Sequence, residues 1–293
     1  FPDLHDPEFC SHFAIVHSRF STNTFPNWSL AQPFRMLAHN GEINTLSANV
    51  FNLGARELSG LGSPLMDAAL FKSALPVLPV TSYSDSQALD NFVEMLYLAS
   101  NRSLAHCLMM AAPQAWESND RLSEEQRAFF RYHSSLLETW DGPANLNFTD
   151  GKQIGALLDR NGLRPCRYIV TNDQRVILAS EVGVVPDIDP SKIVKKGRVA
   201  PGRMLLVDFE KHAIIDDAEL KQELASSLPY AKWVRDETFH LKSEGAEPLF
   251  VKDEDLQVKL HSFGYTHEHL DFLLKSMSEG HEVRLQFLLV FFF

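Results

Sequence analysis

The sequence predicts an α+β fold with antiparallel sheets, and two observations predict it. Two stretches before Trp140, residues 87–110 and 123–137, have helical patterns, whereas after Trp140 short apolar runs come in pairs joined by turns rich in Asp, Asn, Gly or Lys. The pairs are ANLNFTDGKQIGALLD, RYIVTNDQRVILAS and GRMLLVDFEKHAIIDD. Each is typical of a β-hairpin, and successive hairpins form antiparallel sheet. Helices together with hairpins indicate an α+β sandwich rather than a parallel doubly wound fold.

The individual elements outside the hairpins follow from spacing and capping residues. Residues 87–110 carry apolar side chains at helical spacing, and the preceding SDS supplies an N-cap. A second helix is predicted over 123–137, because Ser123 is followed at the third position by Gln126 in a capping-box pattern. Residues 13–20 predict a short buried strand. The charged stretch after Lys221 predicts mainly helix.

Composition and charge exclude several classes of protein. With 293 residues and 45% hydrophobic content, the chain can form one large domain or two ordinary ones around a sizeable core. The net charge of -11 argues against nucleic acid or an acidic membrane as a partner, since either needs a basic surface. The apolar run LQFLLVFFF at 285–293 is shorter than the roughly 20 residues that span a bilayer. We expect no nucleic-acid partner and no membrane partner.

The cysteines offer no convincing nucleophile. Cys10, Cys107 and Cys166 have no paired or metal-like spacing, which argues against a disulfide framework or a zinc site and fits a reducing compartment. Cys10 has no adjacent base, and Cys107 lies in an apolar helical pattern. Cys166 stands among arginines, a setting that can lower a thiol pKa. Burial as a structural residue is the favoured interpretation for Cys107 and Cys166.

The segment HSRFSTNT, residues 17–24, contains a possible carboxylate clamp. An arginine that leaves a strand can offer its planar guanidinium to a carboxylate in two parallel hydrogen bonds, and a nearby threonine can add a hydroxyl. Arg19 and Thr22 have these side chains at suitable spacing. The alternative is that Arg19 forms an ordinary structural ion pair.

The segment AHNGEIN contains two neutral donors side by side. The N–H of Gly41 and the side-chain amide of Asn40 could converge on one oxygen and form an oxyanion hole, which stabilises the tetrahedral intermediate of acyl transfer. The alternative is a tight turn, because Asn-Gly is among the commonest turn dipeptides. From the dipeptide alone the turn is the better interpretation.

Two further motifs have similar alternatives. In SYSDSQALD the carboxylate of Asp85 could bind a substrate ammonium, or it could cap the helix that follows. In DRNGLRPCRY, residues 159–168, the favoured interpretation is a tight turn between two strands. Together, a clamp for a carboxylate, a carboxylate for an ammonium and a pair of oxyanion donors describe a site for an α-amino acid whose side-chain carbonyl is attacked. Glutamine fits that description.

Several blocks of the sequence have a family signature. In chain order they are HSRFSTNTFPNWSLAQPFRMLAHNGEINTL, SDSQALDN, WDGPANLNFTDGKQIGALLDRNGLRPCRY, ASEVGV and KKGRVAPGRMLLVD. These blocks resemble the amidotransferase domain of the glutamate synthases, which are class II glutamine amidotransferases, and the resemblance extends to about Glu282. It implies the four-layer αββα sandwich of the N-terminal-nucleophile hydrolases.

The resemblance also implies an activity and residue roles. The family hydrolyses L-glutamine to glutamate and ammonia, and the ammonia passes through a tunnel to 2-oxoglutarate in a flavin-bearing domain for reductive glutamate synthesis. By this resemblance Arg19 and Thr22 hold the α-carboxylate of glutamine, and Asp85 holds its α-amino group. Asn40 and Gly41 form the oxyanion hole. The implied partners are L-glutamine and the remaining domains of glutamate synthase, in a bacterial cytoplasm or a plastid stroma.

The chain also departs from the family pattern. The family nucleophile is an N-terminal cysteine in a CG setting, and no such residue is found here, so we expect an internal fragment, incomplete at its N-terminus and inactive alone. The expected organisation is a partial amidotransferase domain at 1–235, a helical connection at 236–282 and an aberrant apolar tail at 283–293. No cofactor is expected in this chain, while FMN and an iron–sulfur cluster are implied for the full-length parent. A degenerate glutamine sensor and another class II enzyme remain as alternatives.

Overall fold

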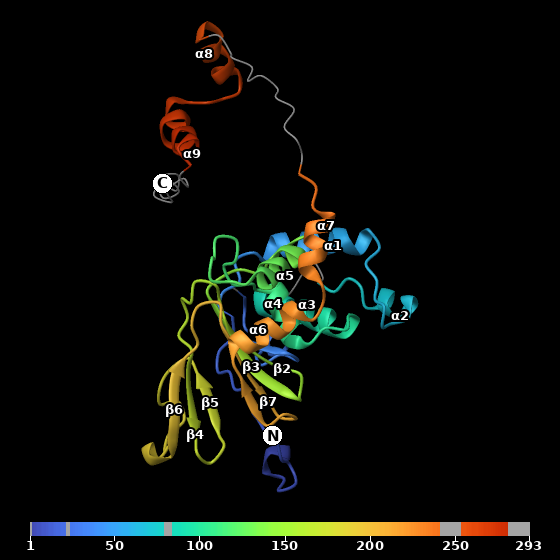
Figure 1. The fold of residues 1–293 in the computed structure, drawn as a ribbon, viewed down its shortest axis with the longest axis vertical. Coiled ribbons are helices and arrows are strands. Elements are labelled where there is room, and N and C mark those ends of the chain that lie inside the picture. Colours follow the sequence, from blue (N-terminus) through green and yellow to red (C-terminus); the bar gives the residue numbers. More distant parts are fainter. Residues whose placement is uncertain (1, 22–23, 79–83, 241–252, 281–293) are drawn as a thin grey trace. The chain divides into compact units, whose positions relative to one another are not determined.

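The fold is that of a computed structural model, which describes residues 2–21, 24–78, 84–240 and 253–280. The chain divides into two compact units, Phe1–Thr238 and Phe239–Phe293. The first unit contains every described strand (Figure 1). The boundaries predicted at 235 and 282 stay predictions, and the tail predicted at 283–293 lies outside the described residues.

A five-stranded antiparallel sheet forms the centre of the first unit. Its strand order is β1-β2-β3-β7-β8, so β1 and β8 are the edge strands. Two of the predicted hairpins, β2–β3 and β7–β8, lie in this sheet and are confirmed. The bounds are Leu37–Gly41 for β1, Ala144–Thr149 for β2, Gln153–Leu158 for β3, Met204–Asp208 for β7 and Ala213–Ile215 for β8.

A smaller sheet of three antiparallel strands has the order β5-β4-β6. The third predicted hairpin, β4–β5, is confirmed here. The bounds are Arg167–Thr171 for β4, Val176–Ala179 for β5 and Ile193–Arg198 for β6. The chain reaches this sheet from β3 through the predicted turn, in which the amides of Asn161 and Gly162 both donate to the Asp159 carboxylate at 3.0 Å.

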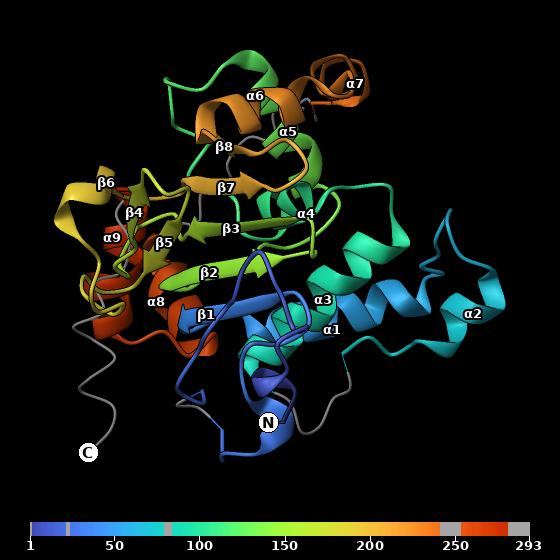
Figure 2. The same ribbon diagram turned by 90° about the horizontal axis from the view of Figure 1, so that it is seen from below.

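The helices of the first unit lie mainly along one face of the five-stranded sheet (Figure 2). Their bounds are Leu46–Leu58 for α1, Ala68–Ser73 for α2, Asp85–Ala99 for α3, Leu104–Ala111 for α4, Glu124–Ser134 for α5, Asp217–Ser226 for α6 and Tyr230–Glu237 for α7. The second unit contains α8 at Asp253–Ser262, a π-helix at His269–Leu274 and α9 at Lys275–Ser278. Mainly helical structure after Lys221 is therefore confirmed for the described residues.

Two separate cores define the layers. The larger core lies between the helices and the five-stranded sheet and includes Leu37, Leu146 and Phe129. The smaller core, formed by Ala156, Leu158, Cys166 and Val199, lies between the two sheets. The described part of the first unit is thus a helix, sheet and sheet sandwich. The α+β class with antiparallel sheets is confirmed, and three of the four expected layers are found in this unit.

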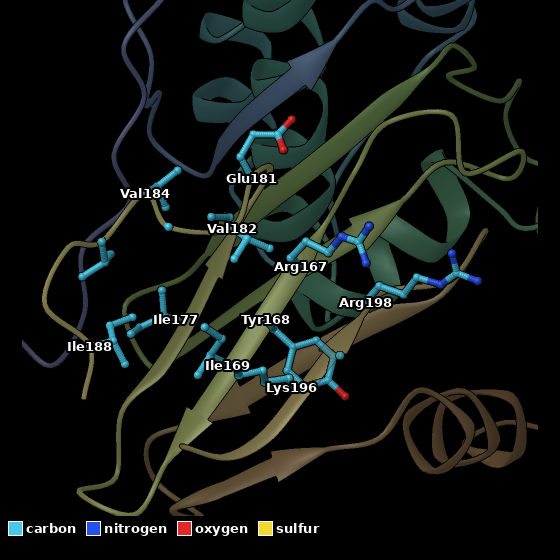
Figure 3. A pocket seen from close by; sticks show the side chains of 14 residues that line it. Arg167, Tyr168, Ile169, Ile177, Glu181, Val182, Val184, Ile188, Lys196 and Arg198 are labelled. Atoms are coloured by element: carbon cyan, nitrogen blue, oxygen red, sulfur yellow. The ribbon is translucent and has the colours of Figure 1, made fainter. Parts of the chain in front are cut away.

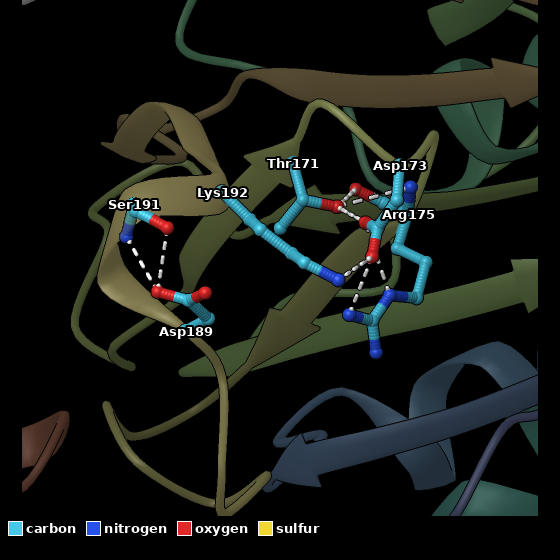
Figure 4. A network of polar contacts seen from close by, with 6 residues as sticks. All are labelled: Thr171, Asp173, Arg175, Asp189, Ser191 and Lys192. Carbon is cyan, nitrogen blue, oxygen red and sulfur yellow. Dashed lines mark hydrogen bonds and ion pairs between the residues drawn. The ribbon is translucent and has the colours of Figure 1, made fainter.

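The outer face of the small sheet is hollowed into a groove of about 370 Å³. Figure 3 shows apolar side chains along it and the guanidinium groups of Arg167 and Arg198 together on neighbouring strands. At the tip of the same sheet, Asp173 accepts hydrogen bonds from Thr171, Arg175 and Lys192 (Figure 4). The bond from Arg175 is the main reason that the pKa of Asp173 is far below its usual value. This exposed network closes the β4–β5 turn against the start of β6.

The structure corrects two predicted elements. The helix predicted over 87–110 is two helices, because Ser100 leaves α3 in an extended conformation and Ser103 caps α4 by accepting from the His106 amide. The strand predicted over 13–20 is wrong: its alternating burial is real, but it pairs with no described strand. Its side chains provide the contacts instead, as when the Phe13 ring stacks on Phe209 at 5.4 Å. The capping box at Ser123 and Gln126 is confirmed.

Candidate substrate and oxyanion site at the edge of strand β1

Asn40 and Gly41 are the last two residues of strand β1, not a turn. Asn40 is paired with Asn145 and Gly41 with Ala144 on β2. The tight-turn alternative for this dipeptide is therefore wrong. In an extended strand, successive side chains point to opposite faces, so the Asn40 side chain lies on the face opposite to that of His39 and Leu37.

The hydrogen-bond pattern shows where the Gly41 amide points. The Thr149 amide donates to Met36 O at 3.0 Å and the Glu42 amide donates to Pro143 O at 3.1 Å. In an antiparallel pair such bonds recur at every second residue, so the even-numbered residues of β1 bond to β2. The amides of Leu37, His39 and Gly41 therefore point to the side of β1 turned away from β2, which we call the β1 edge.

Side chains satisfy two of these three amides. The Leu37 amide donates to Asp90 Oδ1 at 2.9 Å, and the His39 amide donates to Gln32 Oε1 at 2.7 Å. The Gly41 amide has no hydrogen-bond partner in the described part of the chain. It is a backbone donor held in position by a sheet and open to an incoming acceptor.

Only glycine fits at position 41. Its φ is +152°, and a Cβ there would lie 1.9 Å from Pro143 O and 2.6 Å from the Cα of Ala144. This close approach brings the end of β1 against β2 and leaves no space for a side chain. The glycine is thus needed for the position of the amide as well as for access to it.

Asp85 is buried beside the same edge and is 4% exposed. Its Oδ2 accepts from the Ile43 amide at 3.0 Å, and its Oδ1 accepts from the Ser86 amide at 2.8 Å. The cap of α3 is Ser84, whose side chain accepts from the Gln87 amide. Asp85 bonds to one amide of the first turn, but its carboxylate reaches across to the residues after β1.

Arg19 lies in a segment that is fixed at two points along the β1 edge. His17 Nε2 donates to His39 O at 3.0 Å, and Ser21 Oγ donates to Asp85 Oδ1 at 3.1 Å. Arg19 stands midway between these contacts and is exposed. Its guanidinium forms no ion pair with any described residue, so the structural ion pair considered for it is not found. Thr22 lies outside the described residues.

Sequence reasoning missed a second set of residues at this site. His39 Nε2 lies 2.6 Å from Ser86 Oγ, and Asp90 accepts from the amides of Met36 and Leu37, each at 2.9 Å. Burial lowers the pKa of His39 to about 4, against the attraction of the Asp85 carboxylate. Burial also raises the pKa of Asp90, against these amide donors. The sequence offered one signal for His39 and Ser86: each is the immediate neighbour of a predicted site residue, since His39 precedes Asn40 and Ser86 follows Asp85.

The buried cysteines are not activated. Burial raises the pKa of Cys107 to about 12 and that of Cys166 to about 11, so both are thiols at neutral pH. Their predicted burial is confirmed, and Cys10 is exposed. Across the described ranges, no group of three or more His, Cys, Asp or Glu side chains is arranged to hold a metal ion. None of the described helices has the length and apolar character needed to cross a membrane.

The chain matches a known protein family. The family described as glutamine amidotransferases class-II matches residues 1–233. The chain belongs to this family. The match includes all of the β1 edge, from Arg19 and Asn40 to Asp85.

Curated relatives of this class-II chain are glutamate synthases. The NADPH glutamate synthase large chain of Bacillus subtilis is 45% identical over 281 residues, which are 96% of this chain and 18% of that protein. The NADH glutamate synthase of Schizosaccharomyces pombe is 43% identical over 96% of this chain and 14% of that protein. The chloroplastic ferredoxin-dependent glutamate synthase 2 of Arabidopsis thaliana is 41% identical over 95% and 17%, respectively. The chain thus spans less than a fifth of the length of these relatives.

Proposed function

We propose that this class-II domain binds L-glutamine at the β1 edge and stabilises the oxyanion formed during hydrolysis of its carboxamide. The products are glutamate and ammonia. The observation that supports this most directly is the open Gly41 amide, which stands between two outward amides that are satisfied by Gln32 and Asp85.

The oxyanion donors act as a pair. When a nucleophile attacks the carboxamide carbon, negative charge develops on the carbonyl oxygen, which accepts hydrogen bonds from the Gly41 N–H and the Asn40 side-chain amide. Fixed donors aimed at developing charge accelerate such reactions, and loss of one costs about 3 kcal/mol of transition-state stabilisation. The sheet fixes the Gly41 N–H and the backbone of Asn40 before the substrate arrives.

The other end of glutamine is assigned to charged groups. Arg19 has an exposed guanidinium without an ion-pair partner among the described residues, which suits the α-carboxylate, with Thr22 adding a hydroxyl. Asp85 suits the α-ammonium, because its Oδ2 accepts one hydrogen bond, from the Ile43 amide at 3.0 Å, and can accept another from a further donor. The attacking thiolate does not come from Cys107 or Cys166, and the resemblance assigns it to an N-terminal cysteine of the parent enzyme.

The domain serves a glutamate synthase in this proposal. The identity of 45% over 96% of the chain supports this above the other class-II enzymes. Ammonia then passes to 2-oxoglutarate in another domain of the parent, where the resemblance also places FMN and the iron–sulfur cluster. Relatives from a bacterium and a chloroplast support a cytoplasmic or plastid location.

Titration calorimetry of the 293-residue chain with L-glutamine tests the binding site. We expect binding by the unmodified chain and a loss of at least roughly tenfold in affinity for Arg19→Ala and for Asp85→Ala. A coupled ammonia assay tests the assignment of the nucleophile. Glutamine hydrolysis that survives replacement of all three cysteines would contradict it.

A glutamine sensor that binds without cleavage is the second candidate. The raised pKa values of the two buried thiols favour it, because neither is a nucleophile at neutral pH. Immunoblotting of the source cells separates the candidates. A protein of this length that binds glutamine and releases no ammonia is a sensor, whereas a product several times longer is a synthase.

A further inference from the structure

The hydroxyl of Ser86 is the centre of a small buried network. Its Oγ lies 2.6 Å from His39 Nε2, 3.1 Å from Asp85 Oδ1 and 3.5 Å from Gln32 Nε2. A hydroxyl has one hydrogen to donate. The Asp85 carboxylate only accepts, so Ser86 gives its hydrogen to Asp85 and must accept from the other two groups.

This assignment fixes the proton of His39. Nε2 carries the hydrogen that is donated to Ser86, and Nδ1 is bare. Nδ1 is buried without a hydrogen-bond partner in the described part of the chain. The charged groups that act on the ring are Asp85, His17 and Arg164. His39 is thus a neutral side chain whose one donor is committed to Ser86.

The arrangement does not make Ser86 a nucleophile. Ser86 is 2% exposed, and its hydrogen is directed to Asp85 rather than to the histidine. The His39 side chain also lies on the face of β1 opposite to that of Asn40. The network therefore ends on the carboxylate and not on the oxyanion donors.

The Asp85 carboxylate is held asymmetrically. Its Oδ1 accepts from the Ser86 amide, the Ser86 hydroxyl and the Ser21 hydroxyl, while the hydrogen bond to Oδ2 comes from the Ile43 amide. A carboxylate offers about four acceptor positions, two on each oxygen. The crowding of Oδ1 leaves the open position on Oδ2, next to the end of β1.

We propose that His39 is a positioning residue, which acts through Ser86 to hold Asp85 in the orientation that receives the α-ammonium group of the substrate. This inference rests on the proposed function, because it needs glutamine at the β1 edge. His39 joins the strand of the oxyanion donors to the helix that begins with Asp85, across 47 residues of sequence. It thereby sets the spacing between the two ends of one ligand.

The test compares two ligands by calorimetry on the 293-residue chain. They are L-glutamine and glutaramate, which is glutamine without the α-amino group. We expect His39→Leu to weaken glutamine binding roughly tenfold and to leave glutaramate binding unchanged, because only glutamine uses Asp85. His39→Gln restores most of the loss, since its amide can place a donor near Ser86. In an Asp85→Asn background, His39→Leu has no further effect on glutamine.

Ser86→Ala removes the same connection from the other side. We expect Ser86→Ala to weaken glutamine binding and to leave glutaramate binding unchanged, as His39→Leu does. If His39→Leu does not fold, Ser86→Ala provides the test. Equal weakening of both ligands by these variants, or no weakening of either, overturns the proposal. A different result would contradict the proposed function itself. That result is an unmodified chain that does not prefer glutamine to glutaramate, or an Asp85→Asn variant that keeps this preference.

Discussion

The β1 edge and the cluster around Lys221 are both buried and polar, but they differ in the completeness of their hydrogen bonding. Lys221 donates to Asp217 Oδ1 at 2.8 Å, to Gln114 Oε1 at 2.5 Å and to Gly202 O at 2.6 Å, so its three hydrogens are all used. At the β1 edge the Gly41 amide has no hydrogen-bond partner within the ranges that the structure describes. The neighbouring strand pair also contains two of the buried side-chain atoms without a partner among the described residues, His39 Nδ1 and Asn145 Oδ1.

This difference separates a structural cluster from a candidate site. A fully satisfied buried network stabilises the fold, whereas an open donor or acceptor in a buried setting costs stability. The Lys221 cluster joins α6 to the loops before β7 and after α4, and has no position left for a ligand. The Gly41 amide at the β1 edge, by contrast, has no hydrogen-bond partner among the residues that the structure describes.

The largest expected effect tests the closed cluster. Lys221→Met leaves the buried Asp217 with one cationic partner, Arg203, and should lower the free energy of unfolding by about 3–5 kcal/mol. Urea denaturation followed by circular dichroism measures it. Lys192→Met, in the exposed network with Asp173, is the control and should change little. Equal stability of both variants would show that the buried Lys221 cluster contributes no more to stability than the exposed network does.

The next effect concerns the open edge. Gly41→Ala places a Cβ 1.9 Å from Pro143 O and should cost about 3 kcal/mol of folding stability together with glutamine binding. Gly54→Ala in α1 is the matched control, because nothing lies within 4 Å of its added Cβ. In a helix that change should stabilise by about 0.5–1 kcal/mol. A well-folded Gly41→Ala chain with normal affinity would show that the close approach is unimportant.

A third prediction concerns a closed pair of another kind, His106 and His133. Their Nε2 atoms lie 3.0 Å apart, and His133 Nδ1 donates to Phe129 O at 2.7 Å, so both rings are neutral. Burial lowers the pKa of His106 from 6.5 to about 3 and that of His133 from 6.5 to about 4.

The pH dependence of stability follows from these shifts. Below pH 6.5 these two histidines bind protons in the unfolded chain but stay neutral in the folded chain. Their contribution to the free energy of unfolding is therefore fully present above pH 6.5 and is lost as the pH falls toward 4. Each histidine contributes up to about 1.4 kcal/mol per pH unit. Urea unfolding between pH 7 and pH 4.5 should show a flatter profile for the His106→Leu/His133→Leu variant. An unchanged profile would mean that other groups dominate.

The smallest effect on stability is expected at the cysteines. Cys10 is exposed, whereas the thiols of Cys107 and Cys166 are buried with raised pKa values. Labelling with a disulfide reagent at neutral pH should modify one thiol in the folded chain and all three in denaturant. Cys10→Ser should abolish the fast reaction and leave the unfolding free energy unchanged. A second fast thiol in the folded chain would contradict the burial of the other two.

Local signals in the sequence predicted the elements that depend on neighbouring residues. The hairpins β2–β3, β4–β5 and β7–β8 and the capping box of α5 each combine strand or helix pattern with a nearby turn or cap, and all were predicted correctly. Strand β1 was missed because its partner β2 begins more than a hundred residues later, and its Asn-Gly ending resembles a turn. Strand β6 was missed because KKGR is charged and exposed.

The site shows the same limit. Asn40, Gly41 and Asp85 could be selected by chemistry, since donors and carboxylates are visible in the sequence. The connection between His39 and Ser86 could not, because it depends on how a strand and a helix meet in space. Sequence shows which groups are present, and only tertiary structure shows which of their hydrogen bonds are already used.

The position of Asn40 and Gly41 at the end of a paired strand also fixes the angle between their donors. One donor is a side chain that stands perpendicular to the sheet, and the next is a backbone N–H that lies in its plane. The pleat of the strand therefore determines the angle between the Asn40 side chain and the Gly41 N–H, and no loop movement is needed to set it. A shift of one residue in the pairing of β1 with β2 would turn the Asn40 side chain to the other face of the sheet and the Gly41 N–H toward β2, so the direction of both donors depends on the register of a single edge strand.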